Sequence, residues 1–269
     1  MIVDGRRLAQ ERAEEVRTER TRFGALSLGV VMATESPVTK SYVSIKKRAA
    51  ESLNISVEEY HLPDTATTEE IISEVRRAAA GGHDGIILQL PLPLAVDVEA
   101  GKNVIPLMLD VDVLSDAAFD MFSKNDFPAI PPVPAAMWYI LKRNSIPIIG
   151  ANLVIIGKGR LVGRPAEVLF TRLGAHVTTL QKGDDVPSAT KNADIIISGA
   201  GVPALLKPDM IKEGVAIIDG GTSESSGKVV GDADPACAEK ASLFTPVPGG
   251  VGPIAVVEIF ANLVALKAK

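Results

Sequence analysis

The chain has 269 residues, 46% of them apolar, and a formal net charge of −5. This length allows one large or two small domains, and the negative charge gives no reason to expect nucleic acid as a partner. No apolar run reaches the roughly 18 residues that span a bilayer, the mixed charges of residues 1–22 predict no export signal, and the single cysteine, Cys237, fits a reducing cytoplasm.

Helical and strand patterns alternate along the first half of the chain. Helices are predicted at 5–22, 37–53 and 67–80, and strands at 26–32, 56–62 and 85–90. Pro37 suits the first turn of its helix, and Thr67-Thr-Glu-Glu70 supplies a cap with acids in the first turn. Apolar strands that alternate with helices are typical of a parallel sheet covered on both faces.

A second series follows the proline-rich stretch 127–134. Helices are predicted at 134–143, 161–173, 208–212 and 254–266, and strands at 152–156, 176–180, 194–198 and 215–219. This order is typical of a compact βαβ nucleotide-binding domain. We therefore expect an α/β protein with a first domain at 1–125, a dinucleotide-binding domain at 126–253, and a last helix, 254–269, that packs back on the first domain.

A glycine-rich segment, Gly157-Lys-Gly-Arg-Leu-Val-Gly163, lies between a predicted strand and a predicted helix. Glycines allow a tight turn there, and the amides of a helix start can meet a pyrophosphate. The spacing is GxGxxxG rather than GxGxxG, so a plain glycine turn is the alternative. The next strand ends in Leu180-Gln-Lys182, without a carboxylate for a ribose diol. Lys158 and Lys182 are either surface charges or partners of a 2′-phosphate, which favours NADP over NAD.

A tyrosine and a lysine share one face of the second predicted helix. In Ser41-Tyr-Val-Ser-Ile-Lys46, the i,i+4 spacing brings Tyr42 and Lys46 together. Short-chain dehydrogenases also contain YxxxK, but there the glycine loop precedes it, and here the order is reversed. The alternative is a half-buried tyrosine and an exposed lysine on an ordinary amphipathic helix.

Two further polar positions stand beside apolar segments. Gln89 is the single polar residue in the run 85–93, and a buried amide without hydrogen bonds costs roughly 1 kcal/mol or more. Neighbouring backbone groups could satisfy it. Asp110-Val-Asp112 follows an apolar turn, so that one carboxylate can face inward.

The segment Thr245-Pro-Val-Pro-Gly-Gly-Val-Gly-Pro-Ile254 contains three prolines and three glycines. This composition excludes a regular helix or a central strand and predicts a shaped loop before the last helix. Such a loop can receive an anion or a flat ligand at the helix start, or it can be a structural turn.

Together these motifs resemble the methylenetetrahydrofolate dehydrogenase/cyclohydrolase family over nearly the whole chain. They occur in the order of that family: SYVSIK at 41–46, LQLPLP at 88–93, DVD at 110–112, the glycine loop, Gly231-Asp232, and TPVPGGVGP at 245–253. The resemblance implies an amino-terminal α/β folate domain, a Rossmann-like parallel-sheet NADP domain and a cleft between them. It also implies a cytoplasmic homodimer.

The resemblance implies a role for each matching residue of the folate domain. Tyr42 would stack on the folate ring system and Lys46 would be the central catalytic residue. Gln89 would hydrogen-bond Lys46, and Asp112 would hold the amino edge of the pterin. Thr39 stands where the family usually has a serine near the lysine, so that a hydroxyl is still present.

The cofactor and the reaction follow from the same resemblance. The residues expected to bind NADP are Gly157, Lys158, Gly159, Lys182 and Thr222. Pro253 is expected, with Tyr42 and Asp112, to bind the substrate. The implied activity is oxidation of 5,10-methylenetetrahydrofolate to the methenyl cation, followed by hydrolysis of that cation to 10-formyltetrahydrofolate. The expected partners are tetrahydrofolate substrates, without nucleic acid or membrane, and the three scattered histidines predict no metal site.

The chain departs from the usual motifs of the family at several positions. KDVDG is replaced at 109–113, PCTP at 131–134, GRS at 157–159 and GPMT at 252–255. These changes concern pterin contacts and cofactor affinity. The alternatives are therefore a dehydrogenase with weak or no cyclohydrolase activity, and a catalytically silent folate- or nucleotide-binding protein. The presence of both Lys46 and Gln89 speaks against the silent protein, because a binding module needs neither.

Overall fold

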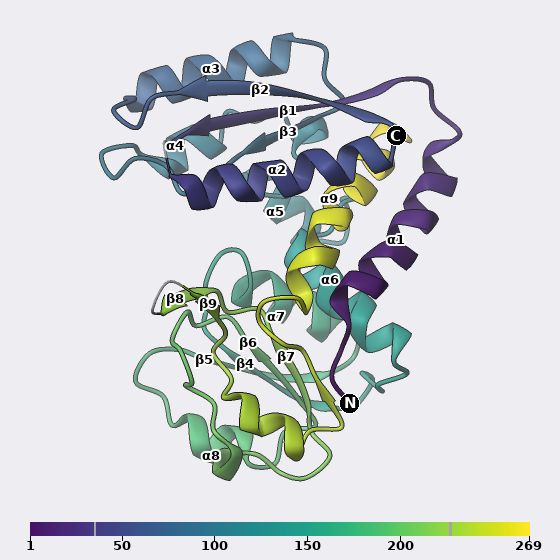
Figure 1. Cartoon of the computed structure of the whole chain (residues 1–269), viewed down its shortest axis with the longest axis vertical. Helices are drawn as coiled ribbons and strands as arrows, with labels where there is room; N and C mark the ends of the chain where they lie inside the picture. The colour runs from purple at the N-terminus through teal and green to yellow at the C-terminus, as the bar shows by residue number, and fades with distance from the viewer. Residues whose placement is uncertain (35, 226–227) are drawn as a thin grey trace. The chain divides into compact units, whose positions relative to one another are not determined.

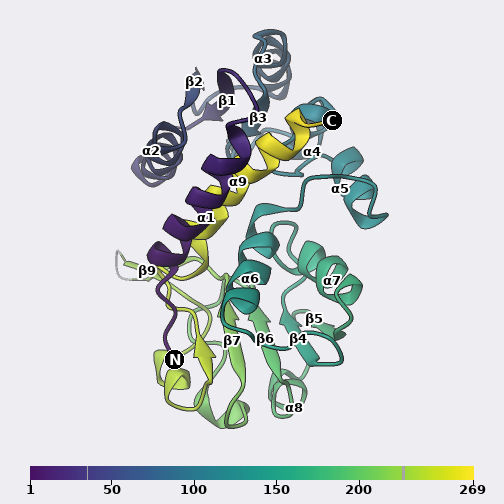
Figure 2. The ribbon, with the colours of Figure 1, turned by 90° about the vertical axis from the view of Figure 1, so that its right-hand side faces the viewer.

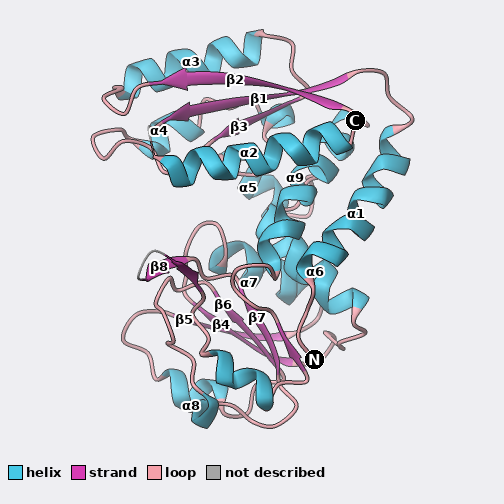
Figure 3. Ribbon diagram, in the orientation of Figure 1, coloured by secondary structure: helices cyan, strands magenta, loops and turns pink. Residues whose placement is uncertain are grey.

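The computed structural model describes residues 1–34, 36–225 and 228–269 (Figure 1). These residues form two compact units. Residues 12–132 and 256–269 form one, called here the three-stranded unit, and residues 1–11 and 133–255 form the other, called the five-stranded unit. Helices and strands alternate in both (Figure 3), which confirms the predicted α/β class.

The three-stranded unit is built on a parallel sheet with the order β2-β1-β3. Its strands are β1 (Leu26–Ala33), β2 (Ile55–Leu62) and β3 (Gly85–Leu88). Helix α2 (Pro37–Ser52) joins β1 to β2, and α3 (Thr68–Ala80) joins β2 to β3. The two helices cover opposite faces of the sheet (Figures 1 and 2), which is why the central strand β1 is buried almost throughout.

Local signals in the sequence set the ends of these helices. Thr67 accepts a hydrogen bond from the Glu70 backbone N–H, and the Glu70 side chain accepts one from the Thr67 backbone N–H at 2.8 Å, so the predicted capping box is present. Pro37 occupies the first turn of α2. Strand β1 ends at Ala33, shortly before α2, and the parallel strand β3 ends at Leu88, directly before Gln89. Because parallel strands end at the same edge of a sheet, the catalytic candidates on α2 and at Gln89 lie at one edge.

Within the described residues, four more α-helices contribute to the three-stranded unit. They are α1 (Gly5–Arg20), α4 (Val98–Lys102), α5 (Asp116–Ser123) and α9 (Val251–Lys267), the first and last of which also extend into residues of the other unit. On α1, Arg12 donates through Nε to Glu258 Oε1 of α9 at 2.8 Å. Burial raises the pKa of Glu258, and the pairing with Arg12 offsets part of the rise. This buried ion pair ties the last helix to residues 12–20.

The five-stranded unit contains a parallel sheet with the order β10-β7-β6-β4-β5 (Figure 2). The strands are β4 (Asn152–Ile156), β5 (His176–Leu180), β6 (Ile195–Ser198), β7 (Ala216–Asp219) and β10 (Leu243–Phe244). The connecting helices are α6 (Pro132–Arg143), α7 (Gly163–Arg172) and α8 (Val186–Thr190), and β8 (Ser223–Ser225) pairs with β9 (Lys228–Val230). Because β5 and β6 lie on either side of β4, the carboxyl ends of β4 and β6 form a topological switch point, where open α/β sheets bind ligands.

The structure corrects several predicted element boundaries. The last helix begins at Val251 rather than Ile254, so part of the proline- and glycine-rich segment is helical. Pro253 is tolerated because the first turn of a helix has no internal partner for its backbone N–H. The strand predicted at 85–90 ends at Leu88, and the helix predicted at 208–212 is a 3-10 turn at Pro208–Met210. Within the described residues, the helices are too short or too polar to cross a membrane.

Candidate active site and cofactor-binding loops

Lys46 and Gln89 meet at the carboxyl edge of the three-stranded sheet. Lys46 lies on α2, and Gln89 follows the last residue of β3. The Lys46 Nζ donates a hydrogen bond to Gln89 Oε1 at 2.8 Å. Gln89 is 9% exposed, and its Nε2 donates to the Leu90 carbonyl at 2.6 Å. The amide is thus satisfied on both sides, by the lysine at its oxygen and by neighbouring backbone at its nitrogen.

The electrostatics of this edge favour a lysine that can lose its proton. Burial lowers the pKa of Lys46, and the negative charge of Asp112 offsets part of that decrease. Burial raises the pKa of Asp112; the positive charge of Lys46 lowers this pKa, and the negative charge of Asp110 raises it further. Because the amine is more readily neutral than an exposed lysine, Lys46 is a candidate general base.

The two carboxylates of the Asp110-Val-Asp112 segment differ in burial and in their partners. Asp110 is fully buried and accepts hydrogen bonds from the backbone N–H groups of Leu114, at 2.9 Å, and Ser115, at 2.8 Å. It therefore holds its own turn ahead of α5. Asp112 is half-buried and lies close enough to Lys46 to raise the pKa of the amine.

Asn262 on α9 anchors the same segment, and the sequence interpretation missed it. Its Nδ2 donates to the carbonyls of Val111 at 2.8 Å and Ile130 at 2.7 Å, and its Oδ1 accepts from the Ile130 backbone N–H at 3.1 Å. A lone amide within the apolar run 254–266 was the signal that could have revealed it. Asn262 thus fixes the backbone directly beside Asp112.

The remaining predicted folate-site residues lie on α2 and α9. Thr39 is in the first turn of α2 and is 3% exposed. Tyr42 lies in α2, one turn before Lys46, but its side chain is outside the described part of the structure. Pro253 is half-buried in the first turn of α9. Stacking of Tyr42 on a folate ring therefore stays a prediction.

The glycine loop follows β4 at the switch point of the five-stranded sheet. Gly157 has a φ of 104°, and a Cβ there would lie 2.8 Å from the Gly199 carbonyl oxygen. A Cβ on Gly163 would lie 1.8 Å from the Gly157 carbonyl oxygen, at the first residue of α7. Both positions need glycine because backbone approaches backbone, while Lys158 and Gly159 between them are exposed. A tight turn with accessible residues before a helix start fits a dinucleotide pyrophosphate.

The other predicted cofactor residues also follow carboxyl ends of strands. Lys182 is exposed, two residues beyond the end of β5. Asp184, in the same turn, accepts a hydrogen bond from the Gln181 backbone N–H at 2.8 Å, so it closes the turn. Thr222 is exposed between β7 and β8. Parallel strands bring these loops and the glycine loop to one edge of their sheet.

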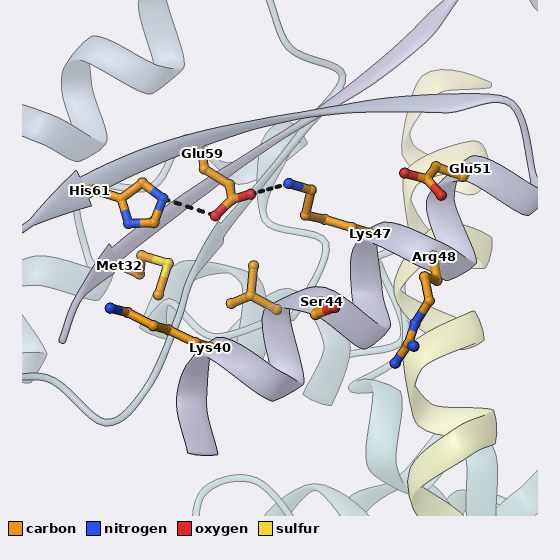
Figure 4. A pocket seen from close by; sticks show the side chains of 9 residues that line it. Met32, Lys40, Ser44, Lys47, Arg48, Glu51, Glu59 and His61 are labelled. Carbon is orange, nitrogen blue, oxygen red and sulfur yellow. Dashed lines mark hydrogen bonds and ion pairs between the residues drawn. The ribbon is translucent and has the colours of Figure 1, made fainter. Parts of the chain in front are cut away.

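A separate surface groove of about 330 Å³ runs along α2 and the edge strand β2 (Figure 4). In it, Glu59 lies between Lys47, with which it forms an ion pair, and His61, whose Nε2 is 2.9 Å from Glu59 Oε2. This pairing lowers the pKa of Glu59 and raises that of Lys47. Among the described residues that line the groove, none belongs to the predicted catalytic or cofactor set, so the groove is not the candidate active site.

Comparison with known proteins covers both units. Residues 3–112 match the catalytic domain, and residues 131–269 the NAD(P)-binding domain, of the tetrahydrofolate dehydrogenase/cyclohydrolase family. The chain is 35% identical to the bifunctional protein FolD of Aquifex aeolicus (strain VF5) over 271 residues, which cover 97% of this chain and 93% of that relative. It is 34% identical to the bifunctional protein FolD of Staphylococcus aureus (strain Newman) over 97% of this chain and 94% of that relative.

Solved structures give the same result. The bifunctional FolD enzyme of Campylobacter jejuni superposes with a TM-score of 0.93 and 31% identity over 100% of this chain and 99% of that one. The FolD enzyme of Trypanosoma brucei, complexed with NADP cofactor and an inhibitor, does so with a TM-score of 0.93 and 28% identity over 100% of this chain and 97% of that one. The chain therefore belongs to the tetrahydrofolate dehydrogenase/cyclohydrolase family.

Proposed function

We propose that Lys46 and Gln89 form the catalytic pair of a bifunctional methylenetetrahydrofolate dehydrogenase and methenyltetrahydrofolate cyclohydrolase. The enzyme is NADP-dependent, and the chemistry that bound NADP supplies is acceptance of a hydride from the methylene bridge of the substrate. The single observation that carries the assignment is the 2.8 Å hydrogen bond from Lys46 to Gln89, on a lysine whose pKa burial lowers.

In the hydrolytic step, Lys46 acts as a general base. An exposed lysine is a poor base at neutral pH because its pKa is about 10.4. Burial and the positive charge of the methenyl substrate both favour the neutral amine. Water forms a bond to the cationic carbon while one of its protons passes to Lys46. The bond from that carbon to N5 then breaks, N5 takes the electron pair and a proton, and the remaining oxygen becomes the formyl carbonyl on N10.

Gln89 suits this role because it positions the amine without adding a charge. Its Oε1 accepts from the Lys46 Nζ, and its Nε2 is held by the Leu90 carbonyl, so the amide cannot easily rotate away. A carboxylate in the same place would hold the lysine protonated.

Further folate contacts are proposed for Asp112, Tyr42, Thr39 and Pro253. Asp112 binds the amino edge of the pterin, with its loop held by Asp110 and Asn262. Tyr42 stacks on the ring system, Thr39 places a hydroxyl near the lysine, and Pro253 contacts the substrate. Support for the last three roles comes from the motifs that carry the family resemblance.

The cofactor residues are proposed at the switch point of the five-stranded sheet. Gly157, Lys158 and Gly159 would hold the pyrophosphate part of NADP, because the loop is tight and exposed there and leads into α7. Thr222 would contact the cofactor from the loop after β7. Lys182 would face the 2′-phosphate, which gives a preference for NADP over NAD.

The domain division and setting are proposed from the same resemblance. Residues 1–125, with the helix at 254–269, would form the folate domain, and residues 126–253 the dinucleotide domain. The enzyme would act as a cytoplasmic homodimer on tetrahydrofolate substrates, without nucleic-acid or membrane partners. The burial of its single cysteine, Cys237, and the net charge of −5 are consistent with this setting.

One spectrophotometric assay tests the proposal. The protein is mixed with 5,10-methylenetetrahydrofolate and either NADP or NAD, and formation and decay of the methenyl species are followed. We expect formation with NADP, and decay faster than in buffer alone. The altered segment 109–113 favours a second candidate, a dehydrogenase with little cyclohydrolase activity, in which the methenyl species would form and then decay at the buffer rate.

A further inference from the structure

A buried carboxylate organises the loop that follows β6. Asp232 lies two residues beyond β9 and is fully buried. Its Oδ2 accepts hydrogen bonds from the Ser198 hydroxyl at 2.7 Å and from the backbone N–H groups of Ala200 at 2.7 Å and Gly201 at 3.2 Å. Its Oδ1 accepts from the Val202 backbone N–H at 2.8 Å. The backbone of residues 200–202 is thus wrapped around one carboxylate.

The loop at residues 199–202, which Asp232 holds, packs against the glycine loop at residues 157–163. The Gly199 backbone N–H donates to the Ile156 carbonyl at 2.9 Å. A Cβ on Gly157 would lie 2.8 Å from the Gly199 carbonyl oxygen, and a Cβ on Gly199 would lie 2.5 Å from Val162 Cγ1. The two loops therefore pack without spare room at the switch point, and a displacement of residues 199–202 would change the space beside Gly157.

A second buried carboxylate links the same cluster to the loop after β7. Asp219 accepts hydrogen bonds from the backbone N–H groups of Gly221 at 2.9 Å and Ala233 at 2.8 Å. A Cβ on Gly221 would lie 2.3 Å from Asp232 Oδ1, and one on Gly231 would lie 2.2 Å from Asp219 Oδ2. The cluster thus holds both the loop beside Gly157 and the loop that carries Thr222.

The partners of Asp232 require a carboxylate. All four are donors: three backbone N–H groups and one hydroxyl. An asparagine offers one oxygen and one NH2 group, so that its NH2 would face a donor and at least one of these N–H groups would lose its acceptor. An uncharged asparagine of the same shape therefore cannot accept all four hydrogen bonds.

We propose that Asp232 is a positioning residue for the dehydrogenase reaction, which sets the conformation of residues 199–202 beside the glycine loop and thereby the affinity for NADP. It acts through the loop rather than by touching the reacting atoms. This inference rests on the proposed placement of NADP at Gly157–Gly159. Because Lys46 and Gln89 lie on the other unit, methenyl hydrolysis in the absence of NADP should respond far less than NADP binding.

The test compares Asp232→Asn with Asp234→Asn, a matched control two positions away whose carboxylate caps the Ala236 backbone N–H. The dissociation constant for NADP is measured by calorimetry, hydrolysis of the methenyl substrate without NADP by absorbance, and amide exchange at residues 200–202 by mass spectrometry. We expect Asp232→Asn to weaken NADP binding about tenfold or more and to speed exchange at 200–202, with a much smaller effect on hydrolysis. Asp234→Asn should change none of the three.

A second variant keeps the proposal testable if Asp232→Asn does not fold. Ser198→Ala removes one of the four donors, and it should weaken NADP binding about threefold. Unchanged NADP affinity in folded Asp232→Asn, or in Ser198→Ala when the first variant fails to fold, would overturn the proposal. So would equal losses in NADP binding and in hydrolysis, because they would indicate a general structural role. A wild-type protein that binds no NADP would instead refute the proposed cofactor.

Discussion

Lys46 Nζ donates to Gln89 Oε1 across 2.8 Å, which joins the helix after β1 to the end of β3. The acceptor is neutral and itself anchored, and Lys46 also feels the charge of Asp112. The pair therefore balances two opposing demands. For the proposed base catalysis, the amine must be oriented, and it must also be able to lose its proton.

Replacing Gln89 with glutamate should change the pH dependence of methenyl hydrolysis. A carboxylate at hydrogen-bond distance raises the pKa of a lysine by about one unit or more. We expect Gln89→Glu to lose activity at neutral pH and to show its optimum at higher pH, as measured by the pH–rate profile. Gln89→Met is the matched control, since it removes the hydrogen bond without adding a charge and should lower the rate without an upward shift of the optimum. An unchanged rate and profile for Gln89→Glu would mean that another group tunes Lys46.

Removing the side chain of Lys182 should reduce the preference for NADP. The lysine is exposed, so its contact with a phosphate is worth only about 1 kcal/mol. Lys182→Ala should therefore lower kcat/KM with NADP about fivefold and leave kcat/KM with NAD unchanged. Lys191→Ala, which removes an exposed lysine at the end of α8, serves as the control. If Lys182→Ala leaves kcat/KM with NADP unchanged, or if kcat/KM of the wild type with NAD equals that with NADP, Lys182 does not bind the 2′-phosphate.

Asp219 should titrate near pH 6. Burial raises its pKa from 3.8 to about 6, and the negative charge of Asp232 adds to the rise. Because the folded-state pKa is above the unfolded value, Asp219 stabilises the fold below about pH 4. This contribution to the free energy of unfolding, about 3 kcal/mol, decreases as pH rises from about 4 and is lost once pH passes about 6. Carbon-13 NMR of the carboxyl group should give an apparent pKa near 6 in the wild type and a lower value in Asp232→Asn. A pKa at or below 3.8 in the wild type would contradict this account.

The elements predicted best are those with strong local signals. Both β4 and β5 agree with the predicted strands at 152–156 and 176–180. Each is a short run that contains β-branched residues and has a glycine within three residues on either side. The structure begins α9 three residues before the predicted start, because the glycine and the proline at 252–253 outweigh the apolar pattern in the sequence interpretation. First-turn positions tolerate such residues, and composition alone does not reveal where the first turn begins.

The candidate site was predictable only in part. Spacing places Tyr42 and Lys46 on one helix face, but the pairing of Lys46 with Gln89 came from the family resemblance and not from periodicity. The roles of Asp232 and Asn262 were missed because each bonds residues far away in the sequence, Ser198 in one case and Val111 in the other. Such contacts depend on strand order and helix packing, which a single sequence does not supply.

Hydrolysis of 5,10-methenyltetrahydrofolate by Lys46→Met tests most directly whether Lys46 activates water. The control is Lys47→Met, which removes the neighbouring lysine that pairs with Glu59, and circular dichroism checks that both variants fold. Loss of general-base catalysis predicts that Lys46→Met hydrolyses the substrate about 10² to 10⁴ times more slowly, with Lys47→Met close to wild type. Hydrolysis at nearly the wild-type rate by folded Lys46→Met would contradict the account.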